Sequence, residues 1–106
     1  TPNENNGYKL EMYIFDVFPF AEKWLIMDVM RDDEFAPVKN APQDPVDSPK
    51  TARELLNAQF ERWITAVGGT VQGEGVLEIA PSVSYEGEGL EKYEGKYIER
   101  PCYLSE

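Results

Sequence analysis

The chain has 106 residues, and its 20 acidic side chains outnumber its 10 basic ones to give a net charge of −10. This excess of carboxylates disfavours binding to nucleic acid or to an anionic membrane surface, because both attract clusters of Lys and Arg. The chain has no histidine and one cysteine, which excludes His-based triads, His zinc sites and a disulfide framework.

The length suits one small domain with one modest core. No apolar run approaches the roughly 20 residues of a membrane span, and the polar residues 1–7 lack the apolar stretch of a signal peptide. With its single thiol, the chain is therefore expected to be a cytoplasmic protein of a reducing compartment.

The first predicted element is a helix over residues 10–18. Apolar side chains recur there with helical spacing, at Leu10, Tyr13, Ile14, Val17 and Phe18. Further apolar residues lie on the other faces, so this helix is expected to be largely buried. Pro19 is expected to end or kink it, because proline removes a backbone donor and clashes with the previous turn.

A strand is predicted next over residues 24–30, where a seven-residue, mostly apolar run (WLIMDVM) precedes an acidic turn. Residues 31–40 are expected to be irregular, since Pro37 restricts the residue before it to an extended conformation. Residues 41–49 hold three prolines and two aspartates and predict a linker.

A second helix is predicted from Pro49 to about Val67. Ser48 is placed to cap it, Thr51 and Glu54 have capping-box spacing, and the Gly pair at 68–69 supplies a left-handed stop. Its expected apolar face consists of Ala52, Leu56, Phe60, Trp63 and Val67. Short strands punctuated by glycines are expected in residues 70–72, 76–85 and 96–104, which makes the predicted fold class α+β.

Two lysines are candidate phosphate ligands. Lys39 follows the predicted strand in a proline-stiffened loop, and the ends of strands in α/β sheets often carry ligand contacts. Lys9 precedes the first predicted helix, whose N-terminus favours a bound anion. The alternative for each is an exposed surface lysine, and residue types alone favour that alternative.

Other motifs have a functional and a structural interpretation. The acidic triple Asp32, Asp33 and Glu34 offers carboxylates to Mg²⁺, although consecutive acids in a loop are usually only solvated. The aromatic residues at and near Tyr13 and Phe15 are interpreted first as part of the hydrophobic core. The alternative is that some of these rings form the wall of a sugar or base pocket. Residues 84–90 (SYEGEGL) are interpreted as a turn, and Cys102, which has no histidine partner, as a structural residue.

Five short motifs, in register along nearly the whole chain, resemble one family. They are residues 6–11 (NGYKLE), 13–21 (YIFDVFPFA), 31–40 (RDDEFAPVKN), 51–53 (TAR) and 84–91 (SYEGEGLE). Together they look like the C-terminal part of a eukaryotic-type UDP-N-acetylglucosamine (UDP-N-acetylhexosamine) pyrophosphorylase. The family's Gly-rich nucleotide loop, which lies upstream of these motifs, has no counterpart in the 106 residues.

The resemblance implies a nucleotidyltransferase that makes UDP-N-acetylglucosamine and pyrophosphate from UTP and N-acetylglucosamine 1-phosphate, with Mg²⁺. By motif position, Lys9 is similar to a lysine near the UTP phosphates and Lys39 to one at the sugar-nucleotide phosphate. Tyr13 and Phe15 stand where the family has a Phe-x-Phe pair beside the N-acetylhexosamine, and Tyr13 departs from that pattern. The resemblance implies no metal ligand and no certain catalytic residue in this chain.

The resemblance also implies how the chain is organised. Residues 1–41 would be the last helix–strand unit and phosphate-contacting loop of a Rossmann-like α/β catalytic domain, and residues 42–106 a small C-terminal α+β domain. The remainder of the catalytic domain would be its partner, and the chain alone is expected to be inactive and to self-associate or be marginally stable. Two alternatives remain at this point: another UDP-sugar pyrophosphorylase, and a noncatalytic acidic interaction module.

Overall fold

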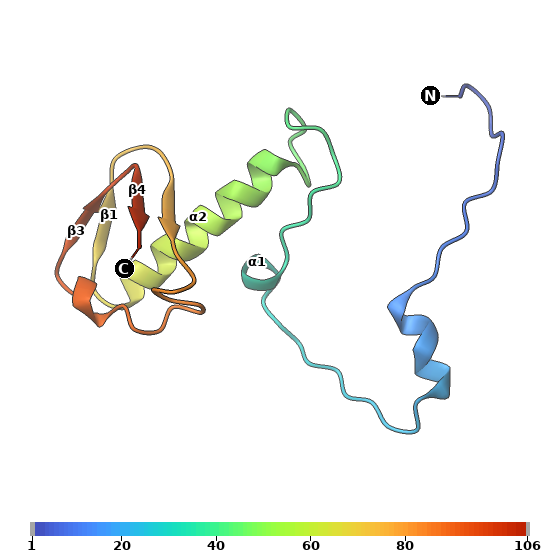
Figure 1. The fold of residues 1–106 in the computed structure, drawn as a ribbon, viewed down its shortest axis with the longest axis horizontal. Coiled ribbons are helices and arrows are strands. Elements are labelled where there is room, and N and C mark those ends of the chain that lie inside the picture. Colours follow the sequence, from blue (N-terminus) through green and yellow to red (C-terminus); the bar gives the residue numbers. More distant parts are fainter. Residues whose placement is uncertain (1, 106) are drawn as a thin grey trace.

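A computed structural model describes residues 2–105, and its best-packed part is built on one long helix, α2 (Pro49–Ala66) (Figure 1). The Ser48 hydroxyl accepts a hydrogen bond from the Thr51 N–H at 3.3 Å, and the Thr51 hydroxyl accepts one from the Ser48 N–H at 3.0 Å. The predicted cap at Ser48 is therefore confirmed, but the box pairs it with Thr51, so the predicted Thr51–Glu54 box is wrong. The predicted stop is confirmed: Gly68 has φ 85°, which glycine adopts without strain.

Four short strands follow α2 and form two separate parallel pairs. Strand β1 (Thr70–Gln72) pairs with β3 (Tyr97–Glu99), and β2 (Leu77–Ile79) pairs with β4 (Cys102–Leu104). A short 3-10 helix, η2 (Glu91–Tyr93), lies between β2 and β3 in the sequence. The α+β class is confirmed, and the predicted strand over residues 96–104 is divided in two around a proline that has no N–H to donate.

The core of this C-terminal unit, which we define as residues 48–105, lies between α2 and the strands. Its fully or nearly buried side chains are Ile64, Leu77, Ile79, Leu90 and Ile98. Phe60, Trp63 and Val67 of the predicted helix face pack against this cluster, as expected. The prediction missed Ile64, the one buried residue of α2, and Leu56 of the predicted face is half exposed, at a groove that it lines with Leu77.

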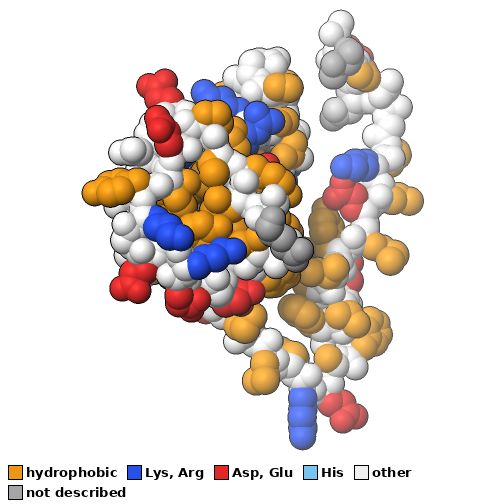
Figure 2. All heavy atoms as spheres, turned by 60° about the vertical axis from the view of Figure 1, so that its left-hand side comes forward, with side chains coloured by type: hydrophobic (Ala, Val, Ile, Leu, Met, Phe, Trp, Pro, Cys, Tyr) orange, Lys and Arg blue, Asp and Glu red, His pale blue; other side chains and the backbone are white. Residues whose placement is uncertain are grey.

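Residues 2–38, here called the arm, run outward from this unit (Figure 1). The helix predicted over residues 10–18 is wrong in its bounds and its burial: a 3-10 helix, η1, spans Ile14–Phe20 and includes Pro19, and none of its residues is buried. Most helix stability comes from burying an apolar face, and nothing in the described chain covers this one. Figure 2 shows apolar side chains projecting along the arm.

The strand predicted over residues 24–30 is absent from the described part of the chain. These residues carry no regular structure, and Leu25, Ile26 and Met27 are 99%, 81% and 83% exposed. A strand exists only when a neighbour accepts and donates its backbone hydrogen bonds, and among the described residues no segment pairs with this run. The apolar pattern was identified correctly, but no strand partner for it lies among the described residues.

One turn of helix, α1 (Arg31–Glu34), interrupts the segment that was predicted to be irregular throughout. It attaches the arm to α2: the Gln59 side-chain amide donates to the Asp33 carbonyl at 3.0 Å, and the Arg62 guanidinium pairs with the Asp33 carboxylate. The radius of gyration is 19.5 Å, against about 13 Å for a compact domain of this length. The described residues include no helix with both the length and the apolar character needed to cross a membrane.

Candidate substrate-binding site

Three of the four predicted site residues lie together on the arm. The Lys9 ammonium pairs with the Glu11 carboxylate, and the Tyr13 hydroxyl donates to the other oxygen of that carboxylate at 2.6 Å. The Tyr13 ring stacks on Phe15, with centroids 5.0 Å apart and planes inclined by 8°. We call these four side chains the arm cluster. The contacts join Lys9, Glu11 and Tyr13, which precede η1, to Phe15, which is its second residue.

The backbone at the centre of the arm cluster is fixed by Asp16. The Tyr13 N–H donates to the Asp16 carboxylate at 3.0 Å, and the Asp16 N–H donates to the Tyr13 carbonyl at 3.0 Å. This reciprocal pair begins η1 and leaves Tyr13 in the extended region, with φ −115° and ψ 147°. The transition from extended chain to 3-10 helix therefore occurs between the two stacked rings.

The charges in the arm cluster affect one another. The Lys9 ammonium, and then the hydrogen bond from Tyr13, lower the pKa of the Glu11 carboxyl below its ordinary value. The same hydrogen bond raises the pKa of Tyr13, since an ionised phenol could not donate to a carboxylate. Glu11 therefore stays ionised and Tyr13 protonated near neutral pH, which are the states that keep both contacts.

Lys39 lies in a closed loop before α2. The Lys39 and Asn40 N–H groups both donate to the Asp47 carbonyl, at 2.7 and 3.0 Å, and the Asn40 side chain donates to the Val46 carbonyl at 2.8 Å. Asp47 itself has φ 49°, a left-handed conformation that Asp tolerates. Residues 41–48 of the predicted linker form a loop of turns and bends, and Pro49 already belongs to α2. The hydrogen bonds to the Asp47 and Val46 carbonyls hold the backbone at Lys39, in addition to Pro37.

The structure does not bring Lys39 to the arm cluster. Within residues 2–105 no hydrogen bond or ion pair joins Lys39 to Lys9, Tyr13 or Phe15, and Figure 1 shows the loop near the start of α2, away from the arm's first helix. The four candidate residues therefore do not form one contact network among the described residues.

The acidic triple does not gather into a metal site. The Asp33 carboxylate is occupied by Arg62, and the described residues contain no group of three Asp, Glu, Cys or His side chains placed to hold a metal ion. Among the described residues, the carboxylates therefore form no metal site with three protein ligands.

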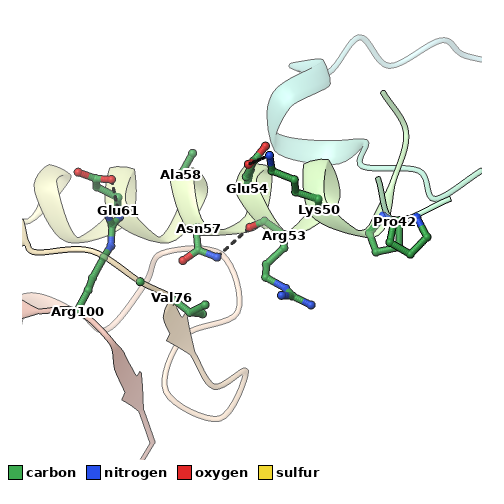
Figure 3. Close-up of a pocket in the computed structure, with 11 residues that line it drawn as sticks. Pro42, Lys50, Arg53, Glu54, Asn57, Ala58, Glu61, Val76 and Arg100 are labelled. Atoms are coloured by element: carbon green, nitrogen blue, oxygen red, sulfur yellow. Dashed lines mark hydrogen bonds and ion pairs between the residues drawn. The ribbon is translucent and has the colours of Figure 1, made fainter. Parts of the chain in front are cut away.

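A cavity in the C-terminal unit opens between α2 and the loop before β2 (Figure 3). Two ion pairs lie on its wall, Arg100 with the Glu61 carboxylate at 2.7 Å and Lys50 with Glu54 at 3.8 Å, and Arg53 lines it as well. The Asn57 side-chain oxygen accepts a hydrogen bond from the Leu77 N–H at 2.6 Å, which ties α2 to β2. The contacts of Asn57 and Arg100 hold the helix on the strands.

The predicted turn at residues 84–90 is confirmed and has an internal anion. The Glu88 carboxylate accepts hydrogen bonds from the N–H groups of Tyr85 and Glu86 at 2.9 and 2.6 Å, and from the Ser84 hydroxyl at 3.1 Å. Hydrogen bonds from the Tyr85 and Glu86 amides lower the pKa of Glu88 to about 2. The loop thus binds its own carboxylate, which gives it a structural role.

The residue that the sequence patterns missed is Glu11. In a helix, residues 9, 11, 13 and 15 would project in different directions, so the predicted helix separated them. On an extended segment, alternate residues share a side. The alternation of Lys9, Glu11 and Tyr13 was the available signal, and it was hidden by the apolar residues at helical spacing.

Comparison with known proteins relates this chain to nucleotide-sugar pyrophosphorylases. The human UDP-N-acetylhexosamine pyrophosphorylase-like protein 1 is 38% identical over 124 aligned residues, which cover 99% of this chain and 24% of the relative. UDP-N-acetylglucosamine diphosphorylase 2 of Arabidopsis thaliana is 42% identical over 93% of this chain and 21% of the relative. No family model matches the chain.

A solved structure gives the same result. A crystal structure from Entamoeba histolytica, described as a UDP-N-acetylglucosamine pyrophosphorylase, superimposes with a TM-score of 0.83 and 34% identity over 98% of this chain and 26% of that one. The predicted resemblance is thereby confirmed: this chain is a homologue of one segment of the UDP-N-acetylhexosamine and UDP-N-acetylglucosamine pyrophosphorylases. It spans about a quarter of the length of the relatives that it matches.

Proposed function

We propose that this chain is the C-terminal part of a uridylyltransferase that joins UTP to N-acetylglucosamine 1-phosphate, giving UDP-N-acetylglucosamine and pyrophosphate. The similarity to proteins with those names carries the proposal, because it covers 93–99% of the chain and includes the arm as well as the C-terminal unit. The superposition over 98% of the chain supports it, since an isolated arm has no reason of its own to adopt that path.

The sequence of the arm is typical of a segment that packs inside a larger α/β domain. Apart from Asp28, residues 24–30 are apolar on both faces, and they have no strand partner among the described residues. Such a run is typical of an inner strand of a parallel sheet. We assign residues 1–41 to the end of a Rossmann-like catalytic domain and residues 42–106 to a small C-terminal domain. The remainder of the catalytic domain would supply both neighbours of the strand.

The proposed reaction forms one bond and breaks another at the same phosphorus. An oxygen of the sugar 1-phosphate attacks the α-phosphate of UTP in line, and the bond to the β-phosphate breaks to release pyrophosphate. Lys9 would neutralise charge on the UTP phosphates, and Lys39 would hold the hexose phosphate. Tyr13 and Phe15 would form a flat aromatic wall beside the N-acetylhexosamine.

Because the chain holds only part of the proposed site, we expect it to be inactive alone. It has no Gly-rich nucleotide loop, its net charge is −10, and its two candidate lysines lie apart. The related family implies Mg²⁺, but the described residues of this chain do not fit that ion, so we assign it no ligand and no step here.

The test uses the intact protein that contains this chain. Lys39→Ala should lower kcat/KM for UDP-N-acetylglucosamine formation by about tenfold or more, because it removes a charge-assisted contact to phosphate. Lys92→Ala, which removes an exposed lysine of η2, is the matched control and should leave kcat/KM unchanged. Equal kinetics for the two variants would contradict the role of Lys39.

Substrate competition separates this proposal from the alternatives. N-acetylhexosamine 1-phosphate should outcompete the non-acetylated hexose 1-phosphate in the intact protein, and the reverse order would indicate another UDP-sugar pyrophosphorylase. No turnover of any sugar phosphate with UTP would favour the noncatalytic module. Micromolar binding of UDP-N-acetylglucosamine to this chain alone would contradict the proposed incomplete site.

A further inference from the structure

We propose that Glu11 is a positioning residue that couples Lys9 to Tyr13, so that the phosphate-binding lysine and the aromatic wall are held as one unit. The inference deepens the proposed function and rests on it for the roles of Lys9 and Tyr13. Glu11 itself would touch neither substrate nor reacting atoms.

The first support is that Glu11 makes both contacts at once. Its two carboxylate oxygens serve different partners, one the Lys9 ammonium and the other the Tyr13 hydroxyl at 2.6 Å. Neither partner has to leave for the other to bind. A single carboxylate between a cation and a phenol therefore fixes the spacing of the two.

The second support is how Tyr13 is otherwise held. Its backbone is clamped by Asp16, and one face of its ring stacks on Phe15 at 5.0 Å. Those contacts restrain the near end and the face of the ring, while the hydroxyl at the far end is anchored only by Glu11 among the described residues. The anchor thus fixes the long axis of the ring, while the stack on Phe15 sets the direction of its faces.

The third support is that Lys9 stays available to a ligand. Its side chain is 85% exposed although it is paired. An ammonium group has three donors, so one can remain on Glu11 while the others meet phosphate oxygens. Glu11 therefore orients the ammonium without withdrawing it from an incoming polyphosphate.

The geometry can be tested in this chain by ultraviolet titration of its tyrosines, using Tyr13→Phe to isolate the Tyr13 signal. In the wild type, Tyr13 should ionise above its ordinary pKa, and Glu11→Gln should return it toward that value of about 10. The control is Glu22→Gln, which removes an equal charge elsewhere on the arm. An unchanged Tyr13 titration in Glu11→Gln would overturn the coupling.

The consequence for substrate binding is tested in the intact protein by a double-mutant cycle. Glu11→Gln should raise KM for the N-acetylhexosamine 1-phosphate about threefold or more, with a smaller effect on kcat, because it loosens a binding wall. In a Tyr13→Phe background the same substitution should have no further effect on that KM, since no hydroxyl remains to be held. Equal effects in both backgrounds would refute the positioning role.

The two failures are distinguishable. If the intact protein shows no pyrophosphorylase activity but the titration shift is present, the proposed function fails while the contact between Glu11 and Tyr13 stands. If the protein is active and the cycle shows no coupling, the proposed function stands and the role of Glu11 is refuted.

Discussion

Deleting residues 1–36 should leave the C-terminal unit folded with most of its stability. The arm attaches to α2 through two polar contacts of Asp33: the ion pair with Arg62 and the hydrogen bond that the Asp33 carbonyl accepts from Gln59. The core cluster of the C-terminal unit contains no residue of the arm. Deletion therefore removes exposed contacts and leaves the apolar core intact.

The expected magnitude follows from those contacts. The Arg62 and Asp33 side chains are 47% and 44% exposed, so their pair contributes about 0.2–1 kcal/mol after solvent screening. The hydrogen bond from Gln59 adds about 0.5–1.5 kcal/mol. The deletion should then lower the free energy of unfolding by about 0.7–2.5 kcal/mol.

Urea unfolding monitored by far-UV circular dichroism measures this difference, because α2 dominates the helical signal. The deletion also removes Trp24 and leaves Trp63 as the sole tryptophan, so its fluorescence reports the core directly. Asp33→Ala in the full chain isolates the ion pair and should cost about 1 kcal/mol or less. A deletion variant that loses cooperative unfolding would refute the reasoning and show that the arm belongs to the folding unit.

Two further predictions concern the C-terminal unit. Gly69→Ala should lower the free energy of unfolding by about 1–3 kcal/mol, because a Cβ there would lie 2.7 Å from Ile64 Cγ2; Gly7→Ala, where the space is open, should be neutral in the same denaturation assay. The lowered pKa of Glu88, about 2 against 4.5, means that the unfolded state binds the proton more tightly. The contribution of Glu88 to stability is therefore complete above pH 4.5 and is lost as the pH falls toward 2. Glu88→Gln should flatten this part of the acid-unfolding curve, and a curve parallel to the wild type would contradict the effect.

The accuracy of the sequence predictions follows the range of the interactions involved. The cap at Ser48, the stop at Gly68 and the turn around Glu88 depend on hydrogen bonds between residues a few positions apart, so their residue types were enough to locate them. The helix over residues 10–18 failed because its apolar pattern implied a burial that the described chain does not provide. Periodicity reports which face needs covering, not what covers it.

In the candidate site, too, the sequence identified single residues and missed the contacts between them. The sequence motifs singled out Lys9, Tyr13, Phe15 and Lys39 through a family resemblance, and the comparisons confirm that resemblance, while the roles of the four residues remain proposals. Glu11 was missed because its link to Lys9 and Tyr13 exists only on a nearly extended chain, whereas a helix had been predicted. The separation of Lys39 from the arm cluster was likewise not readable from spacing along the chain.

By itself the sequence determined the long helix α2 with its ends, the turn around Glu88, and the family motifs. These are local patterns, since each helical hydrogen bond and each cap joins residues that are near in sequence. Only the tertiary structure decided that the net −10 chain divides into a packed unit and an exposed arm, and that residues 24–30 form no strand here. The physical reason is that a strand and a buried face depend on distant partners, and for the arm no such partner lies within the described residues.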